Sequence, residues 1–175
     1  MTTARKDPGL SGALRLTWVT DNLEHVITHS QSVEPPGIWT GLACPAHRLP
    51  IGADVDAATL RHLAQGEVAD LVWEAPEDFT EEYGRLLRAA VHAHQYGDHQ
   101  TGQHLWQQAE ALWASARAAS AEALTLMQHT GLTRFSPHKP QRWVIASYDH
   151  HCGPHGVAHP HVHNIVIPAL TIAPG

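Results

Sequence analysis

Histidine is the residue type whose number and spacing point to chemistry in this chain. Sixteen of the 175 residues are histidine, and six of these lie between His150 and His163. His161 and His163 are separated by one hydrophobic residue, so in a β-strand both imidazoles project from the same face. Two such imidazoles chelate a divalent cation, and a third from a neighbouring strand leaves coordination positions open, as catalytic metal sites do. This spacing predicts a three-histidine metal site.

The third ligand is expected at the end of the preceding strand. His150 directly follows the run RWVIASYD, and His151 is the alternative; His159 shares the face of the other two if the last strand begins early. Three-histidine sites accept several metals, so the predicted cofactor is a divalent ion (Mg²⁺, Mn²⁺, Zn²⁺ or Ni²⁺) whose identity is undetermined. A histidine-rich loop without a defined site is the alternative reading of the same composition.

Apolar patterning predicts the elements that must position these side chains. Strands are expected at residues 14–19, 70–75, 142–148 and 161–167, and helices at residues 21–30, 54–65, 78–94 and 102–129. The two long helices repeat apolar residues every three or four positions, which is typical of helices packed on a sheet. Asp54 or Asp56 is expected to cap the helix at 54–65, with Gly66 after its end. A loop at 150–160 joins the last two strands, and so short a connection favours antiparallel pairing.

Composition excludes several classes of protein. A chain of 175 residues is about one domain, and 43% hydrophobic with 16% charged residues argues against disorder. No apolar run reaches the ~20 residues that span a bilayer, and the N-terminus lacks the apolar region of a signal peptide. Two cysteines are too few for a disulfide framework, so we expect a cytoplasmic protein. The net charge of −6 disfavours a strongly basic nucleic-acid binder but allows a local basic strip. Residues 1–13 are expected to be a flexible lead-in to a single domain at 14–175.

Three stretches occur in an order that one family of enzymes shares. PPGIWTGLACPAHRLPIGADVDAATLRHLAQG, at residues 35–66, is similar to a Gly-x-Trp-x-Gly element followed by a short Val-Asp helix that ends in Leu-x-x-Gly. DLVWEAPEDF, at 70–79, resembles the motif Asp-Leu-Thr-Phe-Ser-Ala-Pro-Lys-Ser. His150, eleven residues before His161, completes the resemblance. Together these stretches resemble HUH endonucleases of single-stranded DNA, in particular the conjugative relaxases of the F-plasmid and R388-plasmid type.

The resemblance implies a fold, a reaction and partners. The fold is α/β (α+β), with a central antiparallel sheet that carries the three-histidine site and is covered on one face by two or more long helices. The reaction is attack by a tyrosine hydroxyl on a phosphodiester of single-stranded DNA at an origin of transfer, with a metal ion polarising the phosphate. Asp70 matches the acidic residue that orients a ligand histidine or helps to deprotonate the nucleophile. Accessory proteins of conjugation are the further partners that it implies.

The chain also departs from the family pattern. Relaxases carry nucleophilic tyrosines near the N-terminus, whereas the first tyrosine here is Tyr83. Tyr148, two residues before His150, is the tyrosine nearest to the predicted site and is our second catalytic candidate beside Asp70. The Lys-Ser of the motif is replaced by Glu77 and Asp78, and the chain ends soon after the histidine motif. These departures predict a relaxase-like domain that is diverged, truncated or catalytically impaired.

Binding of DNA requires a basic strip and surfaces on which bases stack. The cations expected to contact phosphates lie before the strand at 142–148: Arg134, His138, Lys139 and Arg142. Trp39 and Trp73 are the candidate stacking residues, and a place in the hydrophobic core is the stronger interpretation of Trp73.

Two other functions fit parts of the sequence. AHPHVHNIVIP superficially resembles the alternating histidine run of histidine-triad phosphoesterases that act on nucleotides, although Pro160 stands at its first hydrophobic position. A non-enzymatic accessory protein that stores transition metals in its histidine-rich loop is the other alternative.

Overall fold

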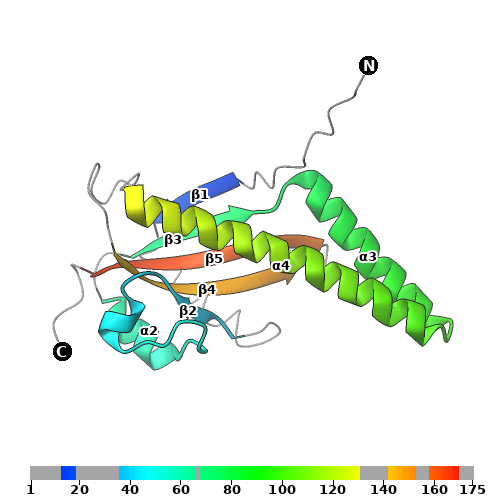
Figure 1. Ribbon diagram of the computed structural model, residues 1–175, viewed down its shortest axis with the longest axis horizontal. Helices are drawn as coiled ribbons and strands as arrows, with labels where there is room; N and C mark the ends of the chain where they lie inside the picture. Colours follow the sequence, from blue (N-terminus) through cyan, green and yellow to red (C-terminus); the bar gives the residue numbers. More distant parts are fainter. Residues whose placement is uncertain (1–12, 19–35, 66–67, 131–141, 153–157, 170–175) are drawn as a thin grey trace, which may run out of the picture.

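Five strands pair into one antiparallel sheet at the centre of the computed structural model (Figure 1). The structure describes residues 13–18, 36–65, 68–130, 142–152 and 158–169. The strands follow the spatial order β1-β3-β5-β4-β2, which places β5 in the middle. Their bounds are β1 Ala13–Trp18, β2 Ile38–Thr40, β3 Ala69–Glu74, β4 Trp143–Cys152 and β5 Ala158–Pro168. The helix predicted at 21–30 and nearly all of the expected lead-in lie outside the described residues.

Two long helices form a hairpin over one face of the sheet (Figure 1). α3 spans Glu77–Gln95 and α4 spans His99–Thr130. α3 begins directly after Pro76, and the carboxylates of its first turn complement the positive end of the helix dipole. The predicted fold class, a mixed α/β architecture with long helices on one face of an antiparallel sheet, is confirmed. Neither helix, nor any other in the described part, has the length and apolar character that crossing a membrane requires.

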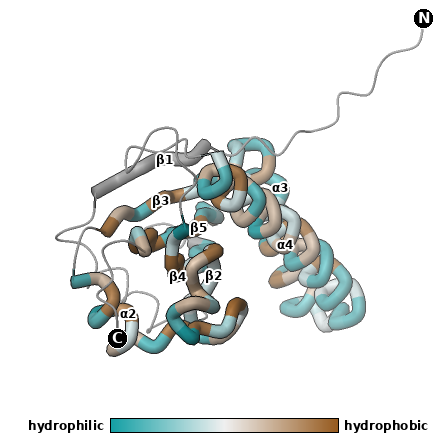
Figure 2. The backbone as a smooth tube through the Cα atoms, turned by 60° about the vertical axis from the view of Figure 1, so that its left-hand side comes forward, coloured by the Kyte–Doolittle hydropathy of each residue, from teal (hydrophilic) through white to brown (hydrophobic). Residues whose placement is uncertain are grey.

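The two faces of the sheet support different layers. On one face, Trp73 and Val162 pack against Phe79 of α3 and Trp113 of α4. On the other face, a second core joins residues of β4 and β5 to Leu60 of the short helix α2, Ala57–Leu63. Figure 2 shows hydrophobic stretches along the strands and hydrophilic ones over the far end of the hairpin. The sheet therefore keeps one face for the long helices and leaves the other to a thinner cover.

The cap of α2 resolves an alternative that the sequence left open. The Oδ2 atom of Asp56, not of Asp54, accepts hydrogen bonds from the backbone N–H of Thr59 at 2.7 Å and from its hydroxyl at 2.6 Å. Hydrogen bonds from the Thr59 hydroxyl and then from its N–H lower the pKa of the Asp56 carboxyl. The helix is shorter than the predicted 54–65 because capping by Asp56 starts it at Ala57.

The prediction of a loop at residues 150–160 is wrong at both ends of that range. β4 continues to Cys152 and β5 begins at Ala158, so the two strands pair beyond the expected turn. His150 pairs with His161, Cys152 pairs with Ala158, and the register shifts between them. Such a bulge admits Pro160 because a proline without an N–H is tolerated where the ladder is interrupted. The antiparallel pairing of these strands is confirmed.

A buried amide fixes how β5 pairs with both of its neighbours. Asn164 is 1% exposed. Its Oδ1 accepts a hydrogen bond from the Ser147 hydroxyl of β4 at 2.8 Å, and its Nδ2 donates to the Leu71 carbonyl of β3 at 2.9 Å. A slip by one residue would turn the amide to the opposite face and break both bonds. Asn164 therefore holds the register of three adjacent strands.

We predict that Asn164→Leu, which keeps the branched shape and the number of heavy atoms but removes both bonds, lowers the free energy of unfolding by roughly 1–3 kcal/mol. The cause is that the Leu71 carbonyl loses the amide that donates to it, and the Ser147 hydroxyl loses its acceptor on β5. Urea denaturation followed by circular dichroism measures the change. Thr125→Ala is the control, because the hydroxyl of Thr125 bonds an exposed helix carbonyl, and we expect a much smaller effect there. An Asn164→Leu protein as stable as the parent would contradict this role.

Candidate metal centre

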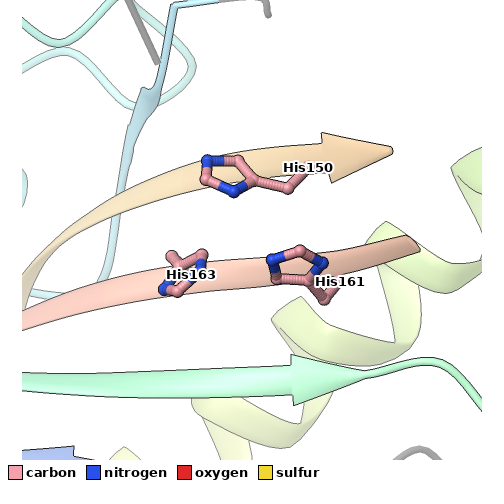
Figure 3. A group of neighbouring side chains, drawn as sticks. All are labelled: His150, His161 and His163. Atoms are coloured by element: carbon pink, nitrogen blue, oxygen red, sulfur yellow. The ribbon is translucent and has the colours of Figure 1, made fainter. Parts of the chain in front are cut away.

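The three predicted histidines come together on the face of the sheet that lies opposite the long helices (Figure 3). His150 of β4 is the direct cross-strand partner of His161, and His163 lies two residues further along β5. One ligand atom of each ring lies within 4.8 Å of those of the other two. Ligand atoms this close together are the arrangement expected around one shared ion, for which metal–nitrogen distances are about 2.0–2.1 Å. The predicted three-histidine cluster is therefore confirmed.

Two of the rings are held by hydrogen bonds at Nδ1, which leaves their Nε2 atoms available to bind an ion. The Nδ1–H of His161 donates to the backbone carbonyl of His159 at 2.7 Å, because a carbonyl only accepts. The Nδ1–H of His163 donates to Oδ2 of Asp70 at 2.6 Å. In the neutral form of each ring, this leaves the lone pair on Nε2. A donor bond on the inner nitrogen that fixes the tautomer is typical of metal-ligating histidines.

Asp70, which the sequence analysis singled out, lies within hydrogen-bond distance of His163 in the structure. It lies on β3 opposite Ile165 and reaches diagonally to His163. Only 5% of the residue is exposed, and its Oδ1 atom is buried without a hydrogen-bond partner among the described residues. A buried carboxylate with an unpaired oxygen is costly unless positive charge compensates it. A divalent cation held by the three histidines would supply that charge, so the residues present fit a metal ion.

The surroundings of His161 favour its neutral, ligating form. Burial lowers the pKa of His161, and the nearby rings of His163 and His159 lower it further, against the carbonyl of His159 and the carboxylate of Glu74. Glu74 is the cross-strand partner of His161 on β3. We did not single it out from the sequence, although its position four residues after Asp70 places both carboxylates on one strand face.

The two alternative ligands lie elsewhere. His151 shares a hydrogen bond of 2.6 Å between its Nδ1 and the hydroxyl of Tyr83, and its ring lies 4.9 Å from that of Trp113. These contacts place it on the helix-covered side of the sheet. His159 is exposed, and its ring centroid lies 5.0 Å from that of His161. It stands beside the cluster without joining it.

Tyr148 lies next to the cluster but is packed into the core. It pairs with His163 across the strands and is 4% exposed. A Cβ atom on Gly37 would overlap its ring, so the absence of a side chain there admits the phenol. Burial raises the pKa of Tyr148 to about 12, with a smaller opposing effect from Arg61. At neutral pH the hydroxyl is therefore protonated, and its role as a nucleophile stays a prediction.

The predicted DNA-binding residues are spread along the chain. Arg134, His138 and Lys139 lie outside the described residues. Arg142 is exposed directly before β4, eight residues before His150. Trp39 is 3% exposed within the core beneath α2, and Trp73, which is 2% exposed, packs in the other core on the helix side. Stacking of Trp39 on a base stays a prediction that requires this packing to open.

Comparison with solved structures identifies the fold. No family model and no curated protein matches the sequence. The structure is similar to that of the conjugative relaxase TrwC complexed with a 27-mer DNA that comprises the recognition hairpin and the cleavage site, with a TM-score of 0.57 at 13% identity. It is also similar to metal-free and metal-bound complexes of TrwC with OriT DNA, with TM-scores of 0.54 and 0.55 at 15% and 12% identity.

These similarities cover 89% of this chain and 55–56% of the relaxase chains. The chain thus spans a little over half the length of the solved relaxases that it matches. It has a TrwC-like relaxase fold, and the sheet that carries its histidine cluster belongs to that fold.

We predict that Asp70→Asn weakens zinc binding by about 10–100-fold, the usual effect of losing a partner that orients a ligand. The amide keeps the shape of the carboxylate but loses the charge that stabilises His163 and the ion. Isothermal titration with Zn²⁺ measures the affinity. His159→Ala is the matched control, because His161 bonds the backbone of residue 159 and not its side chain. Unchanged zinc affinity in Asp70→Asn would overturn this supporting role.

Proposed function

We propose that this chain is a relaxase-like domain that binds single-stranded DNA through a divalent metal ion held by His150, His161 and His163. The observation that carries the proposal is the cluster itself, in which a buried carboxylate orients one ligand and a backbone carbonyl orients another. The relaxase fold supports this function over the histidine-triad phosphoesterase and the metal-storage protein, which have no specific observation in their favour.

The chemistry of the site suits a phosphate group. An ion bound there by three neutral imidazoles keeps its full double charge, so it attracts and polarises a phosphodiester at its open positions. Other residues of the chain orient two of the histidine ligands. Asp70 holds His163, the carbonyl of His159 holds His161, and the side chain of His163 remains 19% exposed, which leaves an approach to the cluster.

DNA at an origin of transfer is the proposed natural ligand. TrwC is solved in complex with such DNA, and this chain shares its fold over a little more than half of that length. The accessory proteins of conjugation, the basic residues before β4 and the cytoplasmic location inferred from the sequence are part of the same proposal.

Cleavage of the bound strand needs a nucleophile beside the cluster. Tyr148 is the tyrosine that the cross-strand register brings next to His163. Its burial and its raised pKa disfavour attack from the arrangement described here. We therefore propose a domain that binds metal and DNA with impaired cleavage, in which Tyr148 acts only after its packing against Gly37 opens.

We expect binding of a fluorescein-labelled single-stranded oligonucleotide of mixed sequence to require metal. Fluorescence anisotropy should show an affinity about tenfold or more higher with Mn²⁺ than after chelation, because a contact to a charged group contributes about 1.5–3 kcal/mol. The double substitution His161→Ala and His163→Ala should abolish this difference. His159→Ala is the control and should keep it. DNA affinity that is indifferent to metal and to the double substitution would refute the proposal.

The role of Tyr148 is tested by the covalent link that a tyrosine nucleophile leaves on DNA. We expect the unaltered chain, incubated with Mn²⁺ and the same oligonucleotide, to show no covalent adduct by denaturing electrophoresis, because the Tyr148 hydroxyl is buried. Tyr148→Phe should bind metal and DNA as the parent does. An adduct formed by the parent and missing in Tyr148→Phe would instead establish an active enzyme with Tyr148 as its nucleophile.

A further inference from the structure

We propose that His94 and His99, at the tip of the hairpin of α3 and α4, form a second transition-metal site that is independent of the three-histidine centre. Their Nδ1 atoms lie 3.2 Å apart, and their rings are tilted by 36°. Both residues are exposed to solvent, so an ion can reach the pair. The hairpin tip projects past the end of the sheet in Figure 1.

The turn between the helices brings the two rings together. α3 ends at Gln95, and Gly97 takes the left-handed conformation at a φ of 82° that reverses the chain. Asp98 then caps α4, because its Oδ1 accepts the N–H of Thr101 at 3.1 Å. His94 thus stands in the last turn of one helix and His99 in the first turn of the next.

Gly102 leaves the space in which the ring of His94 lies. A Cβ atom at this position would stand 2.7 Å from Cδ2 of His94 and 2.8 Å from its Nε2. Gly102 is itself buried within α4. The imidazole therefore rests on the helix backbone, and this contact directs its Nδ1 toward His99. The pair is positioned by the hairpin before any ion binds.

The separation of the two nitrogens matches chelation. Metal–nitrogen distances of about 2.0–2.1 Å place two ligands about 3.4 Å apart in a tetrahedral site and about 2.9 Å apart in a square-planar one. The observed 3.2 Å lies between these values. Without an ion the two nitrogens share one proton. When an ion binds, the donor ring moves that proton to its Nε2, and both Nδ1 lone pairs face the ion without net proton release.

The ligand set selects the class of ion. Two imidazoles without a carboxylate favour Cu²⁺, Ni²⁺ or Zn²⁺, of which Cu²⁺ binds most strongly, and disfavour Mg²⁺ and Ca²⁺. In the part of the chain that the structure describes, no third histidine, cysteine or carboxylate joins the pair. Water fills the remaining positions, so this site is expected to bind more weakly than the central one.

The test separates the two sites. In an untagged full chain with His161→Ala and His163→Ala, we titrate Cu²⁺ alone and follow binding by calorimetry and electron paramagnetic resonance. We expect one equivalent bound through two imidazole nitrogens, and at least ~10-fold weaker affinity after His94→Ala or His99→Ala. His104→Ala is the matched control, because His104 is exposed on α4 and bonds Gln108 instead. A first equivalent that both hairpin substitutions leave unchanged would overturn the proposal.

Two further measurements keep the proposal falsifiable if the substituted sheet folds poorly. In the unaltered chain, Cu²⁺ should broaden the amide resonances around Gly97, and resonances there that stay sharp at two equivalents would count against the site. Gly102→Ala should weaken copper binding at the tip although it removes no ligand, since the added methyl displaces His94. These copper measurements do not depend on DNA, so a failure of DNA binding would not affect their interpretation.

Discussion

The hydrogen bonds that Asn164 makes to both neighbouring strands are the constraint on which the site depends. In an antiparallel sheet, a slip of one residue exchanges the faces of every side chain. With Asn164 fixed toward the helices, His161 and His163 must point the other way, and His150 must stand opposite His161. The diagonal contact from Asp70 follows from the same register. One buried amide therefore decides which side chains meet.

The end of β4 is held by contacts on the helix-covered face of the sheet, whereas His150 points to the opposite face. Asp149, the residue before His150, accepts hydrogen bonds from Nε1 of Trp113 and from the guanidinium of Arg117, both at 3.2 Å. These bonds tie the strand end to α4 while His150 faces the opposite layer. Because successive side chains of a strand point to opposite faces, Asp149 anchors the backbone of β4 to α4 while His150 projects toward the metal site. A backbone held in this way keeps His150 in place even where the ion has open coordination positions.

The sequence predicted four of the five strands, the long helices and the three histidines because each depends on a period of two or of 3.6 residues. It missed β2, whose three residues are too few to show a period. It left His151 as an alternative to His150, since the choice depends on which of the two shares a sheet face with His161 and His163, and the register that pairs His150 with His161 decides that. The role of Asn164 was missed, because a polar residue in an apolar run shows no sign of its partners. The pairing of His94 with His99 depends on the turn at Gly97, which periodicity does not describe.

The contact between Gly37 and Tyr148 has a consequence for how this chain can change over evolutionary time. The phenol occupies the volume that a side chain at residue 37 would need. The side chains at positions 37 and 148 therefore compete for the same volume, and a larger side chain at one position requires a smaller one at the other. Homologous chains with alanine or a larger residue at position 37 are expected to carry a smaller side chain at 148, so the two sites should vary together. A homologue with a larger side chain at position 37 is therefore expected to lack the tyrosine beside the histidine cluster.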